Sequence, residues 1–173
     1  MAKKKKRKQS KSGDGKLLES MLPMALEPLG FTILRNAKER RAYDKQSLLR
    51  PSRVAKKQNP YTTIFGTPGK REWFITDEHR SYTVECKSQN GSGTVDEKMV
   101  LIARTFEEVQ IEDIFILVYH GDWWTCSSRG RAIIEWIRTE AVRLNKIHAP
   151  RQLLIFNIDE LQQFIVKTWG TKK

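Results

Sequence analysis

Residues 72–87, with the sequence EWFITDEHRSYTVECK, contain the two segments from which the fold can be derived. Residues 72–76 and 81–87 are rich in β-branched and aromatic side chains, which favour extended strands. The polar residues 77–80 between them are typical of a turn. The pattern therefore predicts a β-hairpin.

Three chemically active side chains meet at the open end of this hairpin. If the turn is centred between Glu78 and His79, Glu72 lies directly opposite Glu85. Directly opposed side chains share a sheet face, with Cβ atoms roughly 4.5–5.5 Å apart. Lys87 follows Glu85 by two residues and so points to the same face. Two facing carboxylates repel each other unless a cation joins them, and Lys87 compensates only one charge.

A hard divalent cation would compensate the remaining negative charge. Mg²⁺ takes oxygen ligands and keeps several waters, and we expect Mn²⁺ to substitute for it. Such an ion could polarise a phosphodiester and lower the pKa of a bound water. Lys87 would then orient or help to deprotonate the attacking water, or neutralise the phosphate in the transition state. Taken alone, the three side chains fit an ordinary cross-strand salt bridge equally well.

The rest of the chain predicts an α/β fold in which a mixed central sheet is flanked by helices. The order is helix, strand, loop, hairpin, helix, strand, helix, strand and helix. Helices are expected over residues 16–29, 94–108, 128–145 and 159–165, and further strands over 31–34, 113–119 and 153–156. Residues 35–60 are polar, basic and weakly patterned, and we expect them to form a loop or a lightly structured insertion. A single domain over residues 17–173 would then follow a disordered basic tail, residues 1–16.

The positive charge is confined to two segments. The net charge is +12, of which residues 1–16 carry +7 and residues 35–71 carry +9, so the remainder is slightly acidic. A polyanionic partner explains this asymmetry, with nucleic acid as the first candidate and an anionic membrane surface as the second. No apolar run approaches the roughly 18–20 residues of a membrane span. The two cysteines, Cys86 and Cys126, have no metal-type spacing and fit a reducing intracellular setting.

The segment from Glu72 to Lys87 resembles the acid…Glu-x-Lys motif of the PD-(D/E)XK nuclease superfamily, which includes restriction endonucleases and Holliday-junction resolvases. Gln89 extends the motif to Glu-x-Lys-x-Gln, and residues 92–98 resemble the turn and helix start of certain small members. The element order is similar to the αβββαβ core of that restriction-endonuclease-like fold. The first acid of the superfamily is usually an Asp that follows Pro, whereas Glu72 follows Arg71. Asp77 is rejected as this acid because it lies in the turn.

The resemblance implies that Glu72 and Glu85 are metal ligands and that Lys87 is the catalytic lysine. Glu19, in the first helix, takes the place of an additional acid that binds metal or water, or else it is a solvent-facing helix residue. Gln89 contacts the phosphate or the attacking water, or else it is a polar residue at the end of a strand.

Contacts with the DNA backbone are expected from the basic tail, the 35–71 segment and the helix after the hairpin. The residues concerned are Lys3, Lys4, Lys5, Lys6, Arg7, Lys8, Arg40, Arg41, Lys56, Lys57, Lys70, Arg71 and Lys98. For Lys98 a solvated helix lysine is an equal alternative.

The sequence thus predicts a Mg²⁺-dependent deoxyribonuclease, most simply an endonuclease. A structure-specific resolvase, acting as a symmetric homodimer, is one alternative. A DNA-binding protein of the same fold without activity is another, and RNA remains open as a substrate. The expected location is the cytoplasm of a bacterial or phage-infected cell, or the nucleus in a eukaryote.

Overall fold

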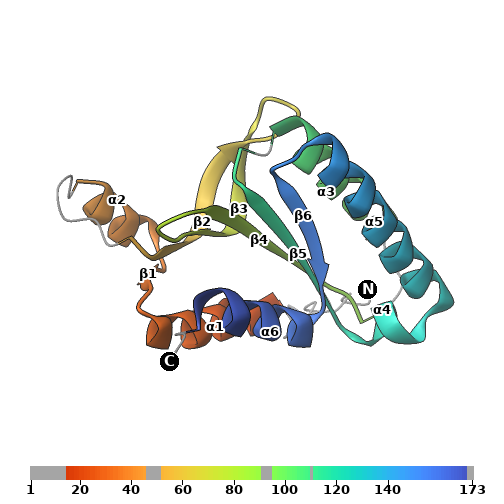
Figure 1. Ribbon diagram of the computed structural model, residues 1–173, viewed down its shortest axis with the longest axis horizontal. Helices are drawn as coiled ribbons and strands as arrows, with labels where there is room; N and C mark the ends of the chain where they lie inside the picture. The colour runs from red at the N-terminus through yellow and green to blue at the C-terminus, as the bar shows by residue number, and fades with distance from the viewer. Residues whose placement is uncertain (1–14, 46–51, 91–94, 110, 171–173) are drawn as a thin grey trace, which may run out of the picture.

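The computed structural model describes residues 15–45, 52–90, 95–109 and 111–170. They form one six-stranded sheet between helices (Figure 1). The elements are α1 (Gly15–Leu26), the 3₁₀ turn η1 (Glu27–Leu29), β1 (Thr32–Leu34), α2 (Ala37–Lys45), β2 (Val54–Thr62), β3 (Pro68–Thr76), β4 (Ser81–Ser88), α3 (Val95–Val109), β5 (Ile114–His120), α4 (Asp122–Cys126), α5 (Ser128–Ile147), β6 (Gln152–Phe156) and α6 (Ile158–Trp169). Of the predicted tail, residues 1–16, the first fourteen lie outside the described residues, and the last two form the start of α1.

The strands lie in the order in which they occur in the chain. Strands β2, β3 and β4 are antiparallel neighbours, whereas β1 pairs with β2 in parallel and β4, β5 and β6 are parallel to one another. The prediction of a mixed central sheet flanked by helices is therefore confirmed.

Each face of the sheet has its own hydrophobic core. One core joins α1 and α6 to the sheet through residues such as Leu22 and Trp169, and the other joins α3 and α5 through residues such as Phe106 and Ile137. Figure 1 shows α1 and α6 on one side of the sheet and α3 and α5 on the other. Strand β5 contributes alternate residues to both cores, which explains its continuous apolar sequence.

The prediction that residues 35–60 form a loop or a lightly structured insertion is wrong. They include α2 and the greater part of β2, a nine-residue strand between β1 and β3. Beyond Lys56, β2 pairs only with β3, so its other edge accepts polar residues and Pro60. Because this part of β2 has a free edge, its sequence lacks the alternation of apolar and polar residues by which a strand is recognised.

The backbone segments that follow the parallel strands β4 and β5 lie very close together at Gln89 and Gly121. Gly121 has φ 105°, and a Cβ at this position would lie 2.4 Å from the carbonyl oxygen of Gln89. Only glycine fits such a contact, which holds the end of β4 against the start of α4. The five-residue helix α4 (Asp122–Cys126) was not among the helices predicted from the sequence.

Candidate active site

The carboxylates of Glu72 and Glu85 are anchored where the β3–β4 hairpin opens. The predicted register is confirmed, because Trp73 lies opposite Val84. At the next position, where Glu72 faces Glu85, the backbone pairing stops and each side chain instead accepts a hydrogen bond from the backbone of the opposite strand. The amide N–H of Glu72 donates to Oε1 of Glu85 at 3.0 Å, and the N–H of Cys86 donates to Oε2 of Glu72 at 2.7 Å. Each acid is therefore oriented by the backbone of the opposite strand.

The backbone departs from regular strand geometry around Glu72. The pairing of β3 with β2 also passes over this residue, and Gln58 on β2 has a left-handed φ of 52°. Trp73 packs in the α1–α6 core, whereas Arg71, two residues earlier, lines a cleft with Glu85. In a regular strand both would share one face. The irregularity thus turns Arg71 toward the cleft.

The cleft has a volume of about 310 Å³ and lies between the hairpin strands and α3. The residues that line it are Tyr61, Lys70, Arg71, Glu85, Lys87, Lys98, Leu101, Ile102, Thr105 and Phe115. Four of them are cations and one is a carboxylate, so the cleft suits an anion. The structure thus brings together Glu85, Lys87 and the predicted phosphate contacts Lys70, Arg71 and Lys98. Glu72 is bonded to the adjacent strand and is not among the lining residues.

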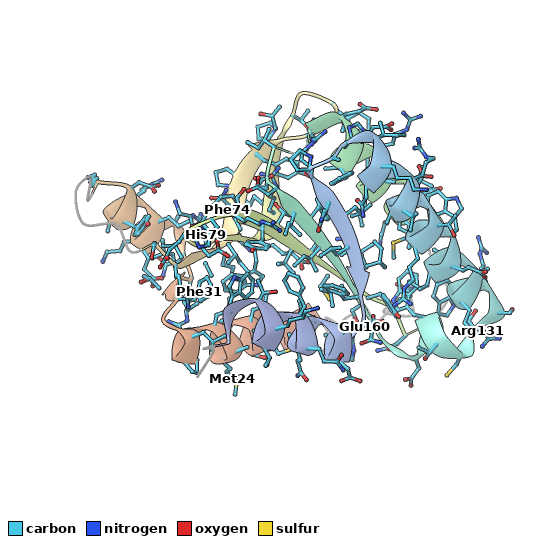
Figure 2. All side chains as sticks on the ribbon, in the orientation of Figure 1. Met24, Phe31, Phe74, His79, Arg131 and Glu160 are labelled. Carbon is cyan, nitrogen blue, oxygen red and sulfur yellow. The ribbon has the colours of Figure 1, made fainter. Side chains whose placement is uncertain are left out.

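Lys87 is held at both its backbone and its side chain. Its carbonyl oxygen accepts a 3.0 Å hydrogen bond from the indole N–H of the buried Trp124 in α4, and its Nζ lies 3.2 Å from Oε2 of Glu85. Burial lowers the pKa of Lys87, but the negative charges of Glu85 and Glu72 outweigh this and hold it above its ordinary value. At neutral pH Lys87 therefore carries its positive charge. Strand β4 runs from the hairpin turn, whose His79 is labelled in Figure 2, to Lys87.

Arg71 is fixed by two residues that the sequence did not single out. Its guanidinium forms a 2.5 Å ion pair with Glu112, and both side chains are at most 5% exposed. It also lies over the ring of Tyr61, 4.6 Å from the centroid. Burial raises the pKa of Glu112, and the charge of Arg71 opposes this rise. No sequence signal links Glu112 to the motif, because only the fold brings the α3–β5 connection next to β3.

Other predicted site residues lie outside the cleft lining or outside the described side chains. Gln89 follows β4, and its N–H donates to the carbonyl of His120 at 2.9 Å. The backbone of Glu19 is in α1, but its side chain lies outside the described part of the structure, as do Lys3, Lys4, Lys5, Lys6, Arg7 and Lys8.

Of the predicted DNA contacts, Arg40 and Arg41 lie on α2, which projects beside the sheet in Figure 1, whereas Lys56 and Lys57 lie on β2, within the sheet. Arg40 donates to the carbonyl of Lys57, and Lys56 pairs with Asp44 at 3.0 Å. Arg41 is exposed on α2. The described contacts of Arg40 and Lys56 thus hold α2 against β2, and the role of these residues toward DNA stays a prediction.

A family model described as a PD-(D/E)XK nuclease superfamily domain matches residues 10–169, nearly the whole chain. The resemblance seen in the sequence is therefore confirmed. Comparisons with curated proteins and with solved structures give no match. In the part of the chain that the structure describes, no helix has the length and apolar character needed to cross a membrane.

Proposed function

Because the chain belongs to the PD-(D/E)XK nuclease superfamily, we propose that it is a Mg²⁺-dependent endonuclease that hydrolyses phosphodiester bonds in DNA. The observation that carries this proposal is the anchoring of Glu72, Glu85 and Lys87 at one end of the hairpin, beside a cationic cleft. Fixed carboxylates and a fixed ammonium supply the preorganised charge that phosphodiester hydrolysis requires.

The donor set fits a magnesium ion. Among the described residues, no group of three or more His, Cys, Asp or Glu side chains is placed so that it could hold a metal ion, so the described part of the chain offers at most two protein ligands here. Mg²⁺ is commonly held by one or two carboxylates together with waters and substrate phosphate, and Glu72 and Glu85 supply the two carboxylates. The amide hydrogen bonds orient these acids without neutralising their charge. Glu19 would be a third acid. Bound there, the ion would act as a Lewis acid and lower the pKa of a water.

Lys87 would stabilise the negative charge that develops on the phosphate in the transition state. Its ammonium lies next to Glu85 and lines the cleft, so an incoming phosphate would meet both a cation and the metal-binding carboxylate. The hydrogen bond from the Trp124 indole to the Lys87 carbonyl oxygen fixes the backbone that carries this side chain. Such positioning matters because a displacement of about 1 Å can cost roughly 100-fold in rate.

Lys70, Arg71 and Lys98 would hold the DNA backbone on either side of the reacting phosphate. They come from β3 and α3, both of which line the cleft. Arg71 is nearly buried and is ordered by Glu112 and Tyr61, so it would act through its positive charge on the cleft, while the exposed Lys70 and Lys98 would make the closer phosphate contacts. These contacts would position a strand without reading its sequence.

Lys87→Ala tests this proposal. We expect the variant to cleave duplex DNA with Mg²⁺ about 10²- to 10³-fold more slowly than the wild type, which is the usual loss when one preorganised charge-stabilising group is removed. Single-turnover cleavage is the measurement. Lys167→Ala, at an exposed position on α6, is the matched control and should cleave at the wild-type rate. An undiminished rate in Lys87→Ala would rule out the role assigned to this lysine.

A further inference from the structure

The turn between β2 and β3 displays a phenylalanine to solvent. Phe65 is 73% exposed, which makes it the most exposed aromatic side chain in the part of the chain that the structure describes. The turn lies at the upper edge of the molecule in Figure 1, whereas α1 and α6 lie at the lower edge. An aromatic ring in this position adds nothing to either core.

The backbone that carries Phe65 is held in one conformation. The hydroxyl of Thr63 accepts hydrogen bonds from the N–H groups of Phe65 and Thr67, both at 3.3 Å, and lies 2.8 Å from the hydroxyl of Thr67. Two backbone bonds also close the turn, and Gly66 supplies the left-handed φ of 71° that it needs. The ring is therefore presented by a preorganised turn, which lowers the entropic cost of binding.

Charge and position both link this turn to the proposed nuclease site. Residues 54–71, which include β2, the turn and the first part of β3, contain four Lys or Arg residues and no Asp or Glu. Lys56 is paired with Asp44 and Arg71 with Glu112, so Lys70 is the cation next to the turn that can face a phosphate. Tyr61 and Lys70, on the two strands of the same hairpin, line the cleft. Phe65 follows Tyr61 by four residues and precedes Lys70 by five, so at about 3.3 Å per residue it lies at most roughly 17 Å from them. That distance corresponds to about five base steps of DNA.

We propose that Phe65 stacks on an unpaired or unstacked base of the DNA, a few nucleotides from the phosphate held in the cleft. An aromatic ring on a cationic hairpin matches the two surfaces of such a strand, the π-face of a base and the phosphate backbone. A lone ring offers too little apolar area for a membrane anchor, whereas one ring is enough to stack on one base. The substrate class is thus DNA with single-stranded character near the cut. The position of the cut rests on the proposed function, but the stacking contact does not.

The test uses the full chain with Ca²⁺ in place of Mg²⁺ and an oligonucleotide that carries 2-aminopurine in a short unpaired bubble. Phe65→Ala should lose the fluorescence change that the wild type produces. Its affinity for the bubble should fall by about 5- to 150-fold, since stacking contributes roughly 1–3 kcal/mol per base. Its affinity for plain duplex should change less, and Phe65→Trp should restore both signals. Met24→Ala is the control, because Met24 is 74% exposed on the outer side of α1 (Figure 2).

Wild-type affinity and fluorescence in Phe65→Ala would overturn the inference. So would a loss of binding to anionic phospholipid vesicles with DNA binding unchanged, which would identify a membrane-contacting residue. A wild type that cuts no DNA, but whose fluorescence change depends on Phe65, would contradict the proposed function and support this inference. If the wild type cuts DNA and Phe65→Ala is indistinguishable from it on every substrate, the proposed function is supported and this inference is contradicted.

Discussion

Glu85→Ala is expected to reduce Mg²⁺-dependent DNA cleavage by about 10³-fold or more. Glu85 joins the parts of the site, because its carboxylate accepts from the Glu72 amide and pairs with Lys87. A metal that supports hydrolysis contributes several kcal/mol of transition-state stabilisation, and about 4 kcal/mol corresponds to roughly 10³-fold in rate. DNA binding should stay near the wild-type affinity or become tighter, because the variant removes a negative charge that repels phosphate.

Two companion variants separate chemistry from folding. Glu85→Gln keeps the shape of the side chain and an oxygen that can accept from the Glu72 amide, but it lacks the charge that a metal needs. It should be as inactive as Glu85→Ala and should unfold at nearly the wild-type temperature. Glu135→Ala, at an exposed position on α5, should be fully active. Full activity in Glu85→Gln would exclude Glu85 as a metal ligand.

Asp77→Ala is expected to destabilise the fold by about 2–5 kcal/mol without touching the site. The carboxylate of Asp77 accepts hydrogen bonds from the N–H groups of His79 and Arg80, each at 2.7 Å, from the hydroxyl of Tyr82 at 2.9 Å and from the indole N–H of Trp169 at 2.8 Å. The last two donors belong to buried side chains. A buried donor left without a partner costs roughly 1–3 kcal/mol.

The same carboxylate makes stability depend on pH. Burial raises the pKa of Asp77, but the hydrogen bonds from Trp169, His79, Arg80 and Tyr82 outweigh this and hold it below the ordinary value of 3.8. Because the pKa is lower in the folded state than in the unfolded chain, the ionised carboxylate stabilises the fold at pH values above the ordinary pKa of Asp. This contribution is lost as the pH falls through the folded-state pKa.

Urea unfolding of the wild type, Asp77→Ala and Asp77→Asn at neutral pH and near pH 3 measures both effects. The stability difference between the wild type and Asp77→Asn should shrink at the lower pH. Glu135→Ala should stay within about 0.5 kcal/mol of the wild type, as is usual for exposed substitutions. Equal stability of the wild type and Asp77→Ala would show that neither the three hydrogen bonds within the hairpin nor the one from Trp169 of α6 stabilises the fold.

Local sequence patterns predicted the part of the site that lies on the hairpin. The register followed from two β-prone segments and a short polar turn, so Glu72, Glu85 and Lys87 could be placed together before the fold was known. Asp77 was rejected as the metal-binding acid because it lies in the turn, and in the structure its carboxylate accepts hydrogen bonds within the turn and from Trp169.

The remainder of the site depends on contacts that local patterns do not encode. Strand β2 was missed because its outer half is polar and pairs on one side only. Without β2, Tyr61 could not be assigned to the cleft. Glu112 and Trp124 were equally out of reach, since each meets its partner, Arg71 or Lys87, only after the sheet and its helices have packed.

The most direct test of the nuclease assignment is cleavage by the wild-type protein of linear duplex, single-stranded, supercoiled and four-way-junction DNA, with Mg²⁺, Mn²⁺ or EDTA. We predict cleavage of at least one substrate with Mg²⁺ and with Mn²⁺, its complete loss in EDTA and its recovery when excess Mg²⁺ is added. Preference for the junction or for single strands would identify a structure-specific enzyme. Tight DNA binding without cleavage of any substrate by either metal, or cleavage that EDTA leaves unchanged, would contradict a metal-dependent site built on Glu72, Glu85 and Lys87.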